Sequence, residues 1–206
     1  MVTLILDFDG TIVEGFSWEA TRNYYDVPSE MVDKYMKGEV TIEDWSDWDF
    51  LRIMKKFQED DIEKIMVQLP LKIGFNEFAK KYFSRFDAVA ILSGGFPQIV
   101  QNFADKYDIK THRVEYEERD GETVITRHID GKTKQEIFRD HYSEERVLYV
   151  VDEAPGFENY ELRDYGKNIL KIQMGSNGEG ELVVHNFFEL GKLVDTILDE
   201  PDKFFQ

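Results

Sequence analysis

The sequence predicts an α/β protein in which helices cover both faces of a parallel β-sheet and a small helical cap is inserted after the first strand. Three observations support this fold class. Apolar, strand-like runs alternate with helix-like stretches along the chain. About 80 residues without a strand pattern separate the first run from the second, far more than one crossover helix needs. Acidic or hydroxyl residues directly follow several runs, as expected where a ligand binds at the carboxyl edge of a parallel sheet.

The predicted core strands are four apolar runs: Val2 to Leu6, Asp87 to Leu92, Arg146 to Val151 and Ile169 to Gln173. Asp7, Ser93 and Asp152 follow the first three of these runs. Because the carboxyl ends of parallel strands meet at one edge of the sheet, we expect these three side chains to face one crevice.

The long segment after the first strand contains several helix starts. Thr41 with Asp44, and Asp60 with Glu63, have the spacing of an N-cap residue and the third helical residue. Four apolar residues recur every three positions and predict one stripe that packs into the core of the cap: Trp45, Trp48, Leu51 and Met54.

The segment Ile73 to Arg85 predicts the helix that leads back into the sheet. We therefore expect a core domain, residues 1–15 and 70–206, and a helical cap, residues 16–69. Later in the chain, Arg113 to Glu117 and Thr123 to His128 flank Asp120-Gly121, which predicts a β-hairpin that extends the edge of the sheet.

Composition excludes several classes of function. The chain has 206 residues and a net charge of −17, which argues against a nucleic-acid or anionic-membrane partner. It has no Cys, and its four His show no ligand spacing, so an oxygen-ligated cation such as Mg²⁺ fits better than zinc. No secretory leader and no apolar run long enough to span a bilayer is found, so we expect a cytoplasmic protein.

The most informative motif is the opening Leu4-Ile5-Leu6-Asp7-Phe8-Asp9-Gly10-Thr11. Side chains alternate along a strand, so Asp7 and Asp9 point to the same side, and Gly10 permits a sharp exit. Two carboxylates this close repel each other unless a cation binds between them or they have different chemical tasks. Nucleophile and general acid in phosphoryl transfer are two such tasks.

Three later segments supply what that chemistry also needs. Ser93-Gly94-Gly95-Phe96 offers a hydroxyl and approachable backbone N–H groups at a strand end. Thr133 and Glu136 have capping-box spacing, which predicts Lys134 as the first helical residue, beside a helix N-terminus that favours phosphate; Lys132 is the alternative. Asp152 follows a very apolar strand and adds a further carboxylate that can bind Mg²⁺.

These four segments, in this order, resemble the haloacid dehalogenase superfamily over nearly the whole chain, and in particular its phosphoserine phosphatase-like branch. The resemblance implies a Rossmann-like three-layer α/β/α core with a mobile cap. It implies Asp7 as a nucleophile that forms an aspartyl-phosphate, and Asp9 as general acid and later base for water. The presence of Asp9 favours phosphate chemistry over dehalogenation, which has no alkoxide to protonate.

The resemblance also implies ligands for the phosphate and the metal. The expected phosphate-binding residues are Thr11, Ser93, Gly94 and Lys134. The expected Mg²⁺ ligands are the carboxylates of Asp7 and Asp152 and the main-chain carbonyl of Asp9.

The fourth motif departs from the family pattern, because Val151, Glu153 and Gly156 replace the usual Gly, Gly and Asp. Glu153 or Glu158 is expected to take the place of the missing acid. The substrate pocket is expected among aromatic and charged residues near the start of the cap: Glu14, Phe16, Trp18, Trp45, Trp48, Asp49 and Arg52. This mixture suits a cationic or apolar leaving group, for example that of a phosphorylated amino alcohol.

The sequence thus predicts a Mg²⁺-dependent phosphomonoester hydrolase whose partner is a small metabolite, phosphoserine or a related amino-acid or amino-alcohol phosphate. Two alternatives stay open. A phosphotransferase or phosphomutase would pass the phosphate from Asp7 to an alcohol, and a non-catalytic binding protein could retain the fold. A homodimer also stays open.

Overall fold

The computed structural model describes residues 1–152, 168–175 and 182–205. Within these residues, parallel strands form one six-stranded sheet in the order β3-β2-β1-β6-β7-β8. Its strands are β1 (Val2–Leu6), β2 (Ala88–Ser93), β3 (Lys110–Arg113), β6 (Arg146–Val151), β7 (Ile169–Met174) and β8 (Val183–Val184). The predicted fold class and its four strands are confirmed, while the edge strands β3 and β8 had not been recognised.

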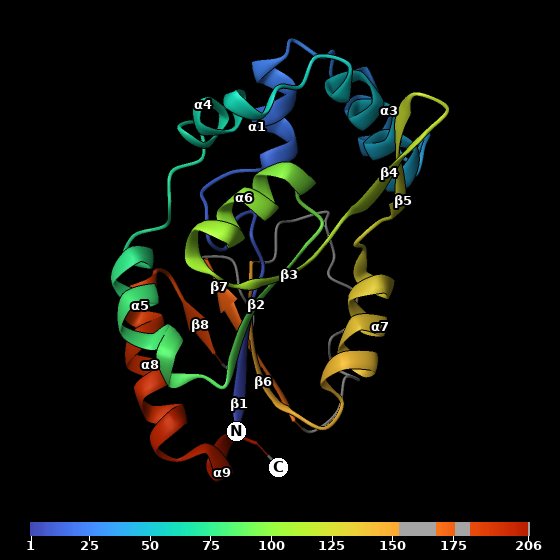
Figure 1. Ribbon diagram of the computed structural model, residues 1–206. Coiled ribbons are helices and arrows are strands. Elements are labelled where there is room, and N and C mark those ends of the chain that lie inside the picture. The colour runs from blue at the N-terminus through green and yellow to red at the C-terminus, as the bar shows by residue number, and fades with distance from the viewer. Residues whose placement is uncertain (153–167, 176–181, 206) are drawn as a thin grey trace.

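Helices cover the sheet on both faces (Figure 1). One face packs on α5 (Phe75–Tyr82), α6 (Pro97–Tyr107) and α8 (Phe187–Asp199), which is followed by α9 (Pro201–Phe204), and the other face packs on α7 (Gly131–Tyr142). Strand β1 shows the reason: Leu4 and Leu6 belong to the first apolar cluster, and Ile5 to the second. Alternating side chains that are all apolar require cover on both sides.

Residues 16–69, called the cap below, form short helices joined by turns and lie above the carboxyl edge of the sheet, opposite the chain termini (Figure 1). The elements of the cap are α1 (Ser17–Tyr24), α2 (Glu30–Met36), α3 (Ile42–Met54), the 3₁₀ turn η1 (Glu59–Asp61) and α4 (Ile62–Met66). None of the described helices is long and apolar enough to cross a membrane.

Of the two helix starts predicted in this segment, one is confirmed and the other is wrong. Thr41 and Asp44 form the predicted capping box at α3, with Asp44 N–H donating to Thr41 Oγ1 at 3.1 Å and Thr41 N–H to the Asp44 carboxylate at 3.0 Å. The start predicted at Asp60 is wrong, because Asp60 lies in η1 and Asp61 precedes α4. The Asp61 carboxylate does not cap the helix, since it accepts hydrogen bonds from two tyrosines and Lys64 instead.

The apolar stripe predicted on α3 is only partly correct. The fully buried residues of this helix are Ser46, Asp49, Phe50 and Ile53. Trp45, Trp48 and Met54 pack against the core while remaining partly exposed. Each step of three residues rotates about 60° short of a full turn in an α-helix, so a strict three-residue repeat spreads around the helix instead of forming one face.

The hairpin forms as β4 (Glu115–Arg119) and β5 (Glu122–Arg127), with Asp120 and Gly121 at positive φ in its turn. The prediction that it extends the main sheet is wrong, since β4 and β5 make a separate two-stranded sheet and β3 is the edge strand. The hairpin instead rises toward the cap, where the Tyr116 and Phe50 rings lie 5.3 Å apart and β5 contacts α3. This apolar contact gives the otherwise polar hairpin something to pack on.

The start of α7 also differs from the prediction. Thr133 and Glu136 do not form a capping box, because Asp130 is the N-cap and its carboxylate accepts a hydrogen bond from Thr133 N–H at 2.7 Å. The helix therefore begins at Gly131, and Lys134 lies one turn inside it. Helix α5 begins two residues later than predicted, after Gly74 at φ +83°, and ends in the 3₁₀ turn η2 (Phe83–Arg85).

Candidate active site

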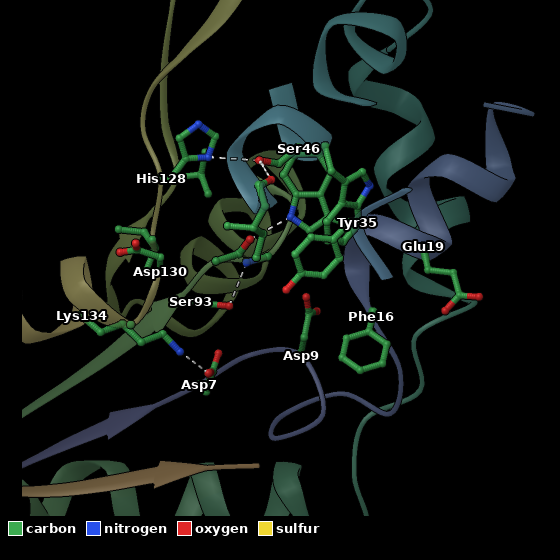
Figure 2. Close-up of a pocket in the computed structure, with 18 of the residues that line it drawn as sticks. Asp7, Asp9, Phe16, Glu19, Tyr35, Ser46, Ser93, His128, Asp130 and Lys134 are labelled. Carbon is green, nitrogen blue, oxygen red and sulfur yellow. Dashed lines mark hydrogen bonds and ion pairs between the residues drawn. The ribbon is translucent and has the colours of Figure 1, made fainter. Parts of the chain in front are cut away.

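A cavity of about 830 Å³ lies between the carboxyl edge of the sheet and the cap (Figure 2). Its core wall includes Asp7, Asp9, Ser93, Gly94, Gly95, Asp130, Lys132, Lys134 and Asp152. Its cap wall includes Phe16, Trp18, Glu19, Arg22, Val32, Tyr35, Met36, Ile42, Trp45 and Ser46. One wall therefore carries carboxylates, lysines and glycines, and the other is mainly apolar and aromatic.

Asp7 and Lys134 form a buried ion pair at the base of the cavity. Asp7 Oδ1 accepts a hydrogen bond from Phe8 N–H at 2.7 Å, and Oδ2 lies 2.5 Å from Lys134 Nζ. Both residues are less than 8% exposed, with Asp7 at 7% and Lys134 at 6%. Burial alone would lower the pKa of Lys134, but the Asp7 charge and the contacts with Asp7 and Tyr149 outweigh it and raise this pKa. The ammonium therefore remains charged beside the Asp7 carboxylate.

Asp9 is oriented by Ser17, the first residue of α1. Ser17 N–H and Oγ–H donate to the two oxygens of the Asp9 carboxylate at 2.9 and 2.8 Å, and Phe96 N–H donates to Ser17 Oγ at 2.8 Å. Burial raises the pKa of Asp9 to about 7, the Ser17 bonds lower it, and the charges of Asp7 and Asp152 add to the rise. A carboxyl group with this pKa can donate and accept a proton near neutral pH.

Asp152 completes a group of three carboxylates. Its main-chain N–H donates to Thr11 Oγ1 at 2.8 Å, and its side chain lies against the main chain of Gly10, where an added Cβ would be 1.8 Å from Oδ2. Burial and then the Asp7 charge raise the pKa of Asp152 to about 6, against the opposing charges of Lys72 and Lys134. The three carboxylates thus repel one another across a short distance.

The loop after β2 fits tightly between cap and core. Ser93 is 1% exposed and accepts a hydrogen bond from Gly95 N–H at 3.1 Å. The Gly94 carbonyl accepts a hydrogen bond from Trp18 Nε1–H at 2.8 Å, and a Cβ on Gly94 would lie 2.6 Å from the Ile129 carbonyl oxygen. Because a side chain does not fit at Gly94, a ligand in the cavity can approach the backbone of this loop and the Ser93 hydroxyl closely.

The donor set suits a hard cation that keeps part of its water shell. Among the described residues no group of three or more His, Cys, Asp or Glu side chains is arranged to bind a metal. Two carboxylates, Asp7 and Asp152, and the Asp9 carbonyl would supply three oxygens, and Mg²⁺ commonly completes its coordination with water and substrate phosphate. Burial raises the pKa values of Asp9 and Asp152, and repulsion from the neighbouring carboxylates adds to the rise; a bound cation would relieve both effects.

No protein-family model and no curated protein matches this sequence. Solved structures do match. A substrate-bound phosphoserine phosphatase is 17% identical, covering 94% of this chain and 97% of that one, with a TM-score of 0.67. A probable phosphoserine phosphatase from Vibrio cholerae is 17% identical over 98% of this chain and 67% of that one, with a TM-score of 0.69. A HAD family hydrolase from Salmonella enterica is 14% identical over 73% of this chain, with a TM-score of 0.58, and the match spans 56% of that hydrolase.

This chain has the haloacid dehalogenase (HAD) fold.

The HAD fold brings most of the predicted site residues to one cavity: Asp7, Asp9, Phe16, Ser93, Gly94, Lys134 and Asp152. Between the two candidate lysines, Lys134 contacts Asp7, whereas Lys132 is exposed at the rim of the cavity. Two predicted ligands lie elsewhere. Thr11 is fully buried and accepts the Asp152 N–H, so it supports Asp152 instead of lining the cavity, and Glu14 is exposed outside the cavity.

The predicted pocket residues of the cap also fall into two groups, those that line the cavity and those that lie outside it. Trp18 and Trp45 line the cavity, while Trp48, Asp49 and Arg52 do not. The Arg52 guanidinium stacks on the Trp48 ring at 3.5 Å, which turns it away from the site. Glu153 and Glu158 lie outside the described residues.

Sequence reasoning missed four residues that shape the site: Ser17, Glu19, Tyr35 and Tyr149. Ser17 could have been suspected as a hydroxyl at a helix start, but its bond to Asp9 depends on the turn between them. Tyr35 lies on α2 among apolar residues with helical spacing, which read as packing residues, although no residue of this helix is buried. Tyr149 lies within a continuous apolar strand and reads as core, although its hydroxyl contacts Lys134.

Proposed function

We propose that this protein is a Mg²⁺-dependent phosphomonoester hydrolase. Its substrate would be a small phosphorylated metabolite, phosphoserine or a related amino-acid or amino-alcohol phosphate. The observation that carries the proposal is the Asp7–Lys134 ion pair beside Asp9, whose pKa of about 7 suits proton transfer. The phosphoserine phosphatases of the same fold support it.

In the proposed mechanism, an Asp7 carboxylate oxygen attacks phosphorus as the bond from phosphorus to the leaving oxygen breaks, and Asp9 donates its proton to that oxygen. Asp9 then takes a proton from water, which attacks the aspartyl-phosphate, releasing phosphate and regenerating Asp7. Lys134, Ser93 and the Gly94 N–H would bind the phosphate oxygens, where their charge and dipoles stabilise the transition state.

Asp7, Asp152 and the carbonyl of Asp9 would hold Mg²⁺, which supplies positive charge to the phosphate when bound. We also propose that residues 16–69 act as a cap over a core made of residues 1–15 and 70–206. The contacts between them include the Trp18 bond to Gly94 and the Ser17 bonds to Asp9 and Phe96.

The test is hydrolysis of p-nitrophenyl phosphate and of a panel of metabolite phosphates, with Mg²⁺ and then with excess EDTA. We expect Mg²⁺-dependent release of inorganic phosphate that is lost in Asp7→Asn, because an amide cannot form the aspartyl-phosphate. Asp9→Asn should lower kcat about 10²- to 10⁴-fold, the usual contribution of a general acid.

Asp26→Asn is a matched control, since Asp26 is exposed and its positive φ is one that Asn tolerates. Turnover by Asp7→Asn at the wild-type rate would exclude the covalent mechanism. Transfer of labelled phosphate to an alcohol without release of inorganic phosphate would instead indicate a phosphotransferase or mutase.

A further inference from the structure

The cap wall of the cavity combines aromatic rings with one unpaired acid. Phe16, Tyr35 and Trp45 line it from the start of α1, from α2 and from α3. Glu19 lies one turn after Phe16 on the same side of α1, and forms no ion pair with any described residue. In Figure 2, Asp9 lies between Lys134 and Asp7 on one side and Phe16 and Glu19 on the other, with the Tyr35 ring above it.

This arrangement separates two ends of a bound substrate. Under the proposed function, phosphate binds beside Asp7 and Lys134, and the leaving oxygen lies at Asp9, which protonates it. The rest of the leaving group must then extend from Asp9 toward the aromatic wall. The chemistry of that wall therefore decides which leaving groups are accepted.

Two aromatic rings of this wall, those of Tyr35 and Trp45, are held in a defined orientation. The Tyr35 and Trp45 rings stack, with centroids 5.3 Å apart and planes inclined by 26°. Trp45 Nε1–H donates to the buried carboxylate of Asp49 at 2.6 Å, which sets the orientation of the indole. Pre-oriented rings beside a carboxylate attract alkylammonium groups, because the faces of the rings carry negative charge density.

Among the described residues, three lysine and arginine side chains line the cavity: Lys134 pairs with Asp7, Arg22 lies on the cap wall, and Lys132 lies at the exposed rim on the opposite, core wall. Arg22 lines the cavity and is 8% exposed. Burial raises the pKa of Asp49, and the charge of Arg22 opposes this rise. The buried Nη1 of Arg22 has no hydrogen-bond partner among the described residues. Lys134 is paired with Asp7, and Arg52 lies outside the cavity on Trp48. Glu19 lies beside the aromatic residues of the cap wall and is not paired with Arg22 or with any other described cation.

We propose that the preferred leaving group carries an alkylammonium cation and no carboxylate, so that the substrates are phosphorylated amino alcohols and not phosphoamino acids. This inference rests on the proposed function and narrows it. Glu19, Phe16, Tyr35 and Trp45 would be the specificity-determining residues. A carboxylate on the leaving group would be repelled by Glu19, whereas an ammonium group would be attracted to it.

The experiment compares kcat/KM for four substrates with Mg²⁺: phosphocholine, phosphoethanolamine, phosphoserine and 3,3-dimethylbutyl phosphate, the uncharged carbon isostere of phosphocholine. We expect phosphocholine to exceed its isostere about 5- to 30-fold, the range that a desolvated cation–π contact gives. Phosphoethanolamine should likewise exceed phosphoserine.

Two variants test the residues through the ratio of kcat/KM for phosphocholine to that for its isostere. Glu19→Gln and Trp45→Leu should each bring this ratio toward one. Glu30→Gln is the matched control, since Glu30 is an exposed acid of the cap outside the cavity, and removing it changes the net charge equally. Because Glu19 is exposed, its variant is expected to fold even if Trp45→Leu does not.

The outcomes separate this inference from the function on which it rests. Hydrolysis of p-nitrophenyl phosphate with no preference for the cationic substrates, or with a preference for phosphoserine, overturns the inference and leaves the hydrolase intact. A preference that survives Glu19→Gln and Trp45→Leu overturns the assignment of these residues. Absence of any Mg²⁺-dependent hydrolysis overturns both.

Discussion

At the scale of single residues, the site depends on close contacts that leave little room for change. Gly10 is at φ +67°, a conformation that disfavours side chains, and its Cα touches the Asp152 carboxylate. Asp49 is buried beneath Trp45, where burial raises its pKa to about 6 against the Trp45 bond and the Arg22 charge. Substitution of either residue should therefore change the free energy of unfolding.

Gly10→Ala is expected to lower both stability and activity. The positive φ costs roughly 1–2 kcal/mol for a residue with a Cβ, and the added carbon must displace Asp152. Gly38→Ala is the control, since Gly38 has a φ of +71° with nothing within 4 Å of an added Cβ. Urea unfolding should show losses in both variants, while Mg²⁺-dependent hydrolysis should fall only in Gly10→Ala. Equal activity in the two variants would contradict the placement of Asp152.

Asp49 predicts a pH dependence of stability. Because the folded pKa of Asp49 of about 6 lies above the ordinary value of 3.8, the folded state binds the proton more tightly, and stability falls as pH rises between these values. In Asp49→Asn this loss is absent. The variant should match wild type near pH 4 and be more stable near pH 7, by up to about 3 kcal/mol at roughly 1.4 kcal/mol per pKa unit. Urea unfolding across this range measures it, and parallel curves for the two proteins would contradict it.

At the scale of elements, α3 is the central helix of the cap. It carries Trp45 and Ser46 to the cavity, packs on α1 and α2, and receives β5 of the hairpin. His128, after β5, contacts Ser46 Oγ and Asp47 Oδ1, each at 3.1 Å. The cap is thus joined to the core through the hairpin as well as through its two chain connections.

Thr41→Ala is expected to destabilise α3 by about 1 kcal/mol, since it removes the hydroxyl that accepts the Asp44 N–H. Thr41→Ser retains that acceptor and should lose much less. Urea unfolding measures both, and proteolysis of the native protein would show whether the cap opens first. No difference between the two variants would mean that the capping box contributes nothing.

At the scale of the whole molecule, an acidic chain places three carboxylates at one end of its sheet. Their mutual repulsion opposes folding, and a bound cation is expected to offset it. The chain carries a net charge of −17, so this local cost adds to a general repulsion. Metal binding should therefore be visible in stability as well as in activity.

Mg²⁺ is expected to raise the melting temperature, corresponding to about 2.7 kcal/mol at a hundredfold excess over the dissociation constant. Excess EDTA should reverse the shift, and Asp152→Asn should abolish most of it. Asp26→Asn serves as control for a lost surface charge. A shift of the same size in Asp152→Asn would indicate general screening of the acidic chain and not a site that includes Asp152.

Some structural features could be predicted from the sequence because they involve residues close together in the chain. Asp7 and Asp9 follow an apolar strand, and Thr41 and Asp44 form a local capping box, so sequence spacing predicted the strand end and the start of α3. Others depend on groups far apart in the chain. Asp130 displaced Thr133 as the N-cap of α7, and Thr11 turned out to support Asp152, more than a hundred residues away.

The sequence by itself determined the α/β class, the four central strands and the order in which Asp7, Ser93, Lys134 and Asp152 arrive at one edge, because these follow from local hydrophobic patterns and chain order. Only the tertiary structure decided which side chains meet there. It paired Lys134 with Asp7, directed Ser17 to Asp9, turned Arg52 onto Trp48 and stacked Tyr35 on Trp45. The physical reason is that such contacts depend on packing between elements distant in sequence, which no local pattern encodes.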